Sequence, residues 1–76
     1  MNNKRRKALG EARTLIEQAA SIVEEVVDGE QEALDNTPEN LQESERYYNM
    51  ENTLDDLYCL HDSLSDIAGQ IEELEK

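Results

Sequence analysis

The sequence predicts an all-α protein, an antiparallel two-helix hairpin that dimerises into a four-helix bundle. Apolar residues recur at heptad spacing in two long segments, which is typical of packed helices. A short segment of turn residues separates them, and no segment alternates between apolar and polar residues as a strand does. The chain has 76 residues, so we treat residues 1–76 as one small domain.

The first predicted helix covers about residues 4–34. Its heptad positions a and d hold Leu9, Ile16, Val23 and Glu30, and Ala12, Ala19, Val26 and Ala33. Further apolar residues flank these positions, and a stripe this wide predicts contact with more than one helix. Gly29 interrupts the pattern. Because a glycine inside a helix costs about 1 kcal/mol relative to alanine, we expect the last turns of this helix to be weak.

A turn is predicted over about residues 35–37 and a second helix over about residues 38–75. Thr37, Pro38 and Glu39 favour a helix start at this point. Threonine can accept a backbone N–H, proline suits the first helical turn, and an acid suits the positive end of the helix dipole.

Ser44 offers an alternative cap, which would place a break near residues 43–45 and start the long helix there. The heptad pattern of the second helix is the more regular of the two. Its positions a and d hold Met50, Leu57, Leu64 and Ile71, and Thr53, Leu60, Ile67 and Leu74. The apolar side chains expected in the core of the oligomer are Ile16, Val23, Leu57, Leu64 and Ile71.

Two helices joined by so short a link should fold back on each other. With the turn centred near residue 36, the first helix begins opposite about residue 68, and the second helix overhangs. The basic cluster Lys4–Lys7 then lies near acidic residues of the second helix, which are Asp66, Glu72 and Glu73. We interpret the cluster first as their charge partner and second as a nucleic-acid or anion site.

A lone hairpin would leave half of each apolar stripe in water. A second copy would cover both stripes and complete a four-helix bundle, so we expect a homodimer. The alternative is that a different protein docks on the open stripe.

Charge is unevenly distributed along the chain, whose net charge is −12. Residues 1–13 carry five cations and one carboxylate, a local charge of +4, whereas residues 14–75 carry 18 carboxylates and the single cation Arg46, a local charge of −17. Such a body repels nucleic acid and anionic membranes, and it favours a partner with a basic surface. The alternative is that the carboxylates only keep the helices soluble.

The sequence has no run of about 20 apolar residues that would span a membrane. Its basic start is not followed by the apolar segment of a signal peptide. We therefore expect no membrane partner and a place in the cytoplasm. A single cysteine, Cys59, cannot form an intrachain disulfide, which suits a reducing compartment.

Groups for catalysis are few. The only histidine, His61, lies two positions from Cys59 and so on a different helix face, which does not make a nucleophile and base pair. Tyr58 stands where a Glu-x-x-His metal motif would need a glutamate. The sequence also lacks calcium, phosphate and zinc motifs. We expect no enzyme activity, no metal and no cofactor, with His61 as a partly buried packing residue.

The candidate partner-binding residues form two groups. Tyrosine and arginine most often anchor interfaces, and the first group contains Arg46, Tyr47, Tyr48 and Asn49. The second group consists of carboxylates on both helices, namely Glu24, Glu25, Asp28, Glu32, Asp55 and Asp62. In the alternative interpretation, Arg46 pairs with a nearby glutamate and Tyr47 closes the end of the bundle.

The block from Asn36 to Arg46, NTPENLQESER, follows a basic start and an acidic helix. With these flanks it resembles a group of small acidic helical proteins encoded by bacteriophages and prophages. The resemblance covers most of the chain and departs at Asp28-Gly29, where a plain helix former is expected. It implies a phage or prophage origin and action in the cytoplasm of a bacterial host.

Together these features predict an interaction protein that inhibits a host defence or nucleic-acid-processing protein by covering its basic surface. Carboxylates along a dimer would recur about every 1.5 Å, near the roughly 1.7 Å per charge of duplex DNA, so mimicry of DNA is numerically possible. Two alternatives stay open. One is an oligomeric sponge in which Lys4–Lys7, Arg13 or Arg46 of neighbouring subunits enclose a nucleotide signal, and the other is a structural or virion accessory protein.

Overall fold

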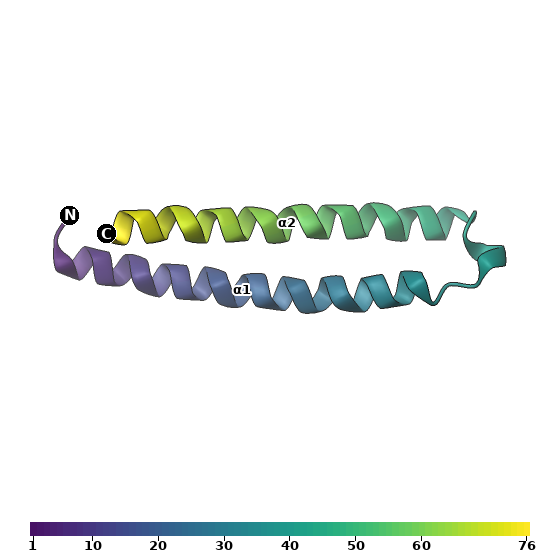
Figure 1. The fold of residues 1–76 in the computed structure, drawn as a ribbon, viewed down its shortest axis with the longest axis horizontal. Coiled ribbons are helices and arrows are strands. Elements are labelled where there is room, and N and C mark those ends of the chain that lie inside the picture. Colours follow the sequence, from purple (N-terminus) through teal and green to yellow (C-terminus); the bar gives the residue numbers. More distant parts are fainter.

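A computed structural model describes residues 1–76 as two long antiparallel helices joined at one end (Figure 1). Helix α1 covers Asn3–Asp35 and helix α2 covers Glu45–Glu75, with the short 3-10 helix η1 at Glu39–Leu41 between them. There is no strand. The prediction of an all-α helical hairpin is confirmed. The hairpin is a rod whose extents are 60 × 14 × 13 Å.

Helix α1 is continuous over its 33 residues. It begins after Asn2, whose Oδ1 accepts a hydrogen bond from the backbone N–H of Arg5 at 2.9 Å. It then passes through Gly29 without a break and ends at Asp35. The weakness expected at Gly29 therefore does not interrupt the helix.

Helix α2 begins at Glu45, not at Pro38. The Ser44 side chain is the cap, because its Oγ accepts a hydrogen bond from the N–H of Tyr47 at 3.2 Å. Thr37 belongs to the end of α1 instead, since its hydroxyl donates to the carbonyl of Ala33 at 3.0 Å. Pro38 has an extended backbone (φ −57°, ψ 145°), so the chain leaves the helical path there.

The longer connection changes the register between the helices. Arg13 Nε donates to Glu75 Oε2 at 2.7 Å, and Tyr58 Oη donates to Gln31 Oε1 at 3.4 Å. These contacts place the C-terminal end of α2 beside Arg13, so α1 overhangs α2, and Figure 1 shows the N-terminus lying beyond the C-terminus. The expected overhang of the second helix was wrong, because the connection is three times longer than the predicted turn.

The basic cluster Lys4–Lys7 consequently makes no ion pair with the carboxylates of α2. Arg13 is the N-terminal cation that bridges the helices, and it also pairs with Glu17 on its own helix. Within the cluster, Arg6 Nη1 donates only to Asn3 Oδ1, at 3.4 Å. The expectation that this cluster pairs with the carboxylates of the second helix is therefore wrong.

The core consists of four buried side chains, Ala20, Val27, Leu54 and Ala68. All four occupy heptad position e when Leu9 and Met50 are assigned to a. The a-position residues predicted for the oligomer core are half-buried at this seam, namely Ile16, Val23, Leu57, Leu64 and Ile71. The helices of one chain therefore meet along positions a and e.

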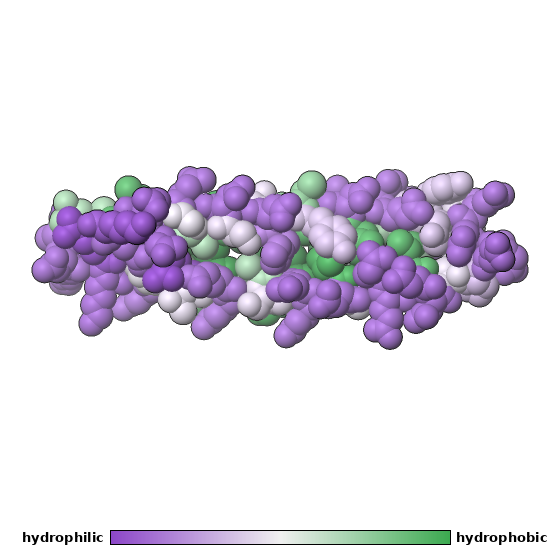
Figure 2. Space-filling model, viewed as in Figure 1, coloured by the Kyte–Doolittle hydropathy of each residue, from purple (hydrophilic) through white to green (hydrophobic).

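The d positions expected in the seam are largely exposed. Val26, Leu60, Ile67 and Leu74 keep 46%, 56%, 44% and 58% of their surface in water. One partner helix covers only one side of a wide apolar stripe, and α2 covers the side that carries position e. The other side stays open. Figure 2 shows one face of the rod, which is largely hydrophilic, with hydrophobic residues visible mainly between the helices.

Replacing Gly29 with alanine should raise the free energy of unfolding by about 1 kcal/mol, because alanine is the better helix former. A Cβ atom at Gly29 meets nothing within 4 Å. At Gly10 it would lie 2.6 Å from Glu75 Oε1, the carboxylate that binds Arg13. Denaturant unfolding followed by circular dichroism should therefore show a gain for Gly29→Ala and a smaller gain or a loss for Gly10→Ala. A larger gain for Gly10→Ala than for Gly29→Ala would contradict this register.

Candidate functional site

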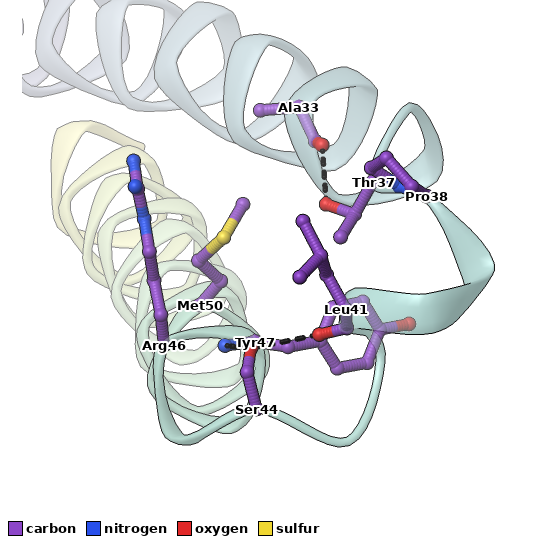
Figure 3. Close-up of a pocket in the computed structure, with 8 residues that line it drawn as sticks. All are labelled: Ala33, Thr37, Pro38, Leu41, Ser44, Arg46, Tyr47 and Met50. Atoms are coloured by element: carbon purple, nitrogen blue, oxygen red, sulfur yellow. Dashed lines mark hydrogen bonds between the residues drawn. The ribbon is translucent and has the colours of Figure 1, made fainter.

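A hollow of about 430 Å³ lies at the closed end of the hairpin, between the end of α1, η1 and the start of α2 (Figure 3). Its lining residues are Ala33, Thr37, Pro38, Leu41, Ser44, Arg46, Tyr47 and Met50. Arg46 and Met50 lie on one side, and Leu41 and Tyr47 lie on the other. The sequence identified Arg46 and Tyr47 as candidates but did not predict the hollow.

Two hydrogen bonds of the Ser44 hydroxyl stabilise the closed end of the hairpin. The Ser44 hydroxyl donates to the carbonyl of Leu41 at 2.7 Å and accepts the N–H of Tyr47. It thereby ties η1 to the first turn of α2. Leu41 remains 48% exposed at the rim of the hollow, so an apolar side chain and a guanidinium are both available to a partner.

The two neighbouring tyrosines have different environments. Tyr47 is half-buried, whereas Tyr48 keeps 51% of its surface in water. Their rings meet edge to face, with centroids 6.4 Å apart. Desolvation, followed by the nearby carboxylate of Glu51, raises the pKa of Tyr47 above the usual 10.0. Tyr48 is therefore the more accessible of the pair for contact with a partner.

Arg46 is exposed and makes no ion pair. The alternative in which a nearby glutamate neutralises it is not observed. Asn49 is also exposed and lies one turn along α2 from Arg46. Three polar side chains at the closed end of the rod, those of Arg46, Tyr48 and Asn49, are thus free to contact a partner.

The six predicted carboxylates do not converge on one patch. Glu25 and Glu32 lie along the outer side of α1, whereas Asp55 and Asp62 lie along the outer side of α2. Asp28 also lies on α1. The acidic surface therefore follows both outer edges of the rod.

One pair of these carboxylates does come together, around His61. Its Nε2 lies 3.9 Å from Glu24 Oε2, and its Nδ1 lies 3.9 Å from Asp62 Oδ1. The His61 side chain is only 30% exposed, which agrees with a packing residue at the seam. Cys59 is exposed and does not share this location.

Most carboxylates are unpaired. Five of the 19 lie within 4.0 Å of a basic group, namely Glu17, Glu24, Asp62, Glu73 and Glu75. The remaining 14 have no cation within that distance. All but Glu30 and Glu51 are exposed, so the charge of the other twelve is available to any basic surface that approaches the rod.

Neither long helix contains a stretch apolar enough to span a lipid bilayer. No three His, Cys, Asp or Glu side chains converge in a way that could hold a metal ion. Comparisons with protein-family models, with curated proteins and with solved structures found no match for the chain.

The phenol of Tyr47 should make stability depend on alkaline pH. The pKa of the Tyr47 phenol is higher in the folded state than in the unfolded state. The contribution of this phenol to stability is therefore complete below pH 10, and it is lost as the pH rises through the folded-state pKa. Denaturant unfolding at a series of alkaline pH values should show this loss in the native chain and a smaller loss in Tyr47→Phe. The same pH dependence in both proteins would contradict the assignment to Tyr47.

Proposed function

We propose that this protein is a non-catalytic interaction protein of phage or prophage origin. It acts in the cytoplasm of a bacterial host, where it binds a basic surface of a defence or nucleic-acid-processing protein and blocks it. The observation that carries the proposal is the set of 14 carboxylates without a cation partner on a chain of net charge −12. Charges that are not neutralised within a protein attract oppositely charged partners and accelerate association.

The shape of the rod supports this role. Carboxylates on the outer side of α2 extend from Glu45 to Glu73, about 42 Å at 1.5 Å per residue, which is the dimension of a duplex segment of a little more than one turn. A protein surface that binds the phosphates of nucleic acid would meet a comparable row of negative charges. The partner is therefore a protein, and nucleic acid itself would be repelled.

We also propose that the hairpin dimerises into a four-helix bundle. Four buried side chains, two of them alanines, make a small core for 76 residues. Burial of large apolar side chains is the main stabilising term in folding. A second copy would bury the d-position residues that each hairpin leaves in water.

The first test is capture of the tagged protein from nuclease-treated bacterial lysate at low and high salt. A basic protein should be retained at low salt and released at high salt. With that purified partner, the double variant Glu25→Gln, Glu32→Gln should bind about tenfold more weakly, because two contacting charges are lost.

The matched control is Glu39→Gln, Glu43→Gln, which removes the same charge from the connection between the helices. It should bind more strongly than the first double variant. Equal weakening in both would mean that net charge alone attracts the partner. Retention that is insensitive to salt would contradict charge-based binding.

The closed end of the rod gives a separate prediction. Arg46→Ala with Tyr48→Ala should weaken binding of the captured partner by about tenfold or more, because exposed arginine and tyrosine side chains commonly anchor interfaces. Neither side chain is buried or ion-paired, so helicity measured by circular dichroism should be unchanged. Full binding by the double variant would limit the interface to the acidic edges.

A further inference from the structure

One face of the rod is apolar and uncovered. On α1 it comprises the d and g positions, which hold no charged residue from Ala8 to Ala33. On α2 it comprises position d. The large residues of this open face are Leu15, Ile22, Val26, Leu60, Ile67 and Leu74, which are 44% to 65% exposed.

Two observations show that the two helices contribute to the same face. The hydrogen bond between Tyr58 and Gln31 joins the b positions of the two helices, so both b positions lie on the same face of the hairpin. On each helix, position d lies on the other side of the a and e positions that form the seam. The d positions of the two helices therefore share the opposite face. Residues of both helices also line one hollow at the open end of the rod. Among them are Arg5 at position d and Ala8 at position g of α1, and Leu74 at position d of α2.

We propose that a second copy of this chain covers the open face in a head-to-tail orientation, with the closed end of each hairpin beside the termini of the other. This inference rests on the dimer proposed above and specifies its interface and its symmetry. The twofold axis runs across the helices, so α1 packs antiparallel to α1 of the second copy.

The size of the open face suits a stable dimer. At 1.5 Å per residue, residues 8–33 extend about 38 Å, and two helices side by side are about 20 Å wide. The footprint is therefore about 750 Å² per copy, close to the roughly 800 Å² per partner of a specific interface. Alanines and Gly29 among the large residues let the helices approach closely.

Charge selects the head-to-tail orientation. Residues 1–13 and 70–76 form the end with the termini, where six cations and four carboxylates give a net +2. Residues 28–48 form the closed end, where seven carboxylates and one cation give a net −6. Head-to-tail pairing places these opposite charges together. The same-end orientation would instead place the closed ends of the two copies side by side, each with a net charge of −6.

The helix dipoles favour the same orientation. The cations of Lys4–Lys7 lie at the positive end of α1, and the last turn of α1 has acidic but no basic residues. Neither end of α1 is compensated within the helix, because its first turn has no acidic residue and its last turn has no basic residue. In the head-to-tail dimer, the basic first turns of one α1 lie beside the acidic last turns of the other.

Sedimentation equilibrium tests the interface. The native chain should be a dimer, and Ile22→Glu or Leu60→Glu should weaken self-association by about a hundredfold or more, because each would bury an unpaired charge. Tyr58→Glu is the matched control, since Tyr58 is 46% exposed on the opposite face. It should remain dimeric. A monomeric native chain, or equal loss in the control, would overturn the interface.

Spin labels test the orientation without altering the open face. In a Cys59→Ser background, Glu43→Cys would place one label at the closed end of each copy. Head-to-tail pairing should give a distance of about 60 Å between the labels, the length of the rod, and same-end pairing about 20 Å, the thickness of the bundle. The short distance would overturn the orientation while leaving the proposed dimer intact. Partner capture remains an independent test of the acidic surface.

Discussion

The width of the apolar stripe on α1 is the constraint on which the rest of the structure depends. Apolar residues occupy four heptad positions and span about 160° of the helix circumference. One neighbouring helix cannot cover that width, and α2 covers only the a and e side. The core is consequently limited to four buried side chains, and the d and g side remains a continuous apolar surface.

The heptad spacing predicted two helices, but it could not predict which flank of the stripe α2 covers. Positions d and e lie on either side of a, and both carry apolar residues in this chain. The choice depends on where the second helix lies, which the connection determines. Val26 and Val27 illustrate the point, because adjacent residues of the same type have exposures of 46% and 4%.

The candidate site was predictable in its residues and not in its shape. Arg46 and Tyr48 could be selected because they are the sole cation of an acidic body and a tyrosine of the outward helix face. The hollow beside them depends on η1 and on the hydroxyl of Thr37, which bonds back to α1. A threonine before a proline favours either helix end, so the sequence could not distinguish these outcomes.

Self-association and partner binding would use different surfaces of the rod. The open face carries no carboxylate on α1 between Ala8 and Ala33, whereas most unpaired carboxylates lie on the outer side of the helices or in the connection. Pairing through the open face would therefore bury apolar surface and leave the carboxylates in the middle of each rod free, while those at the closed end would lie beside the basic first turns of the other copy. It would also double the number of carboxylates in the assembly, since each copy contributes its own edges. A helix whose apolar stripe is too wide for one neighbouring helix thus favours pairing of two hairpins, and the pair would bring together the carboxylates that each copy keeps on its outer side.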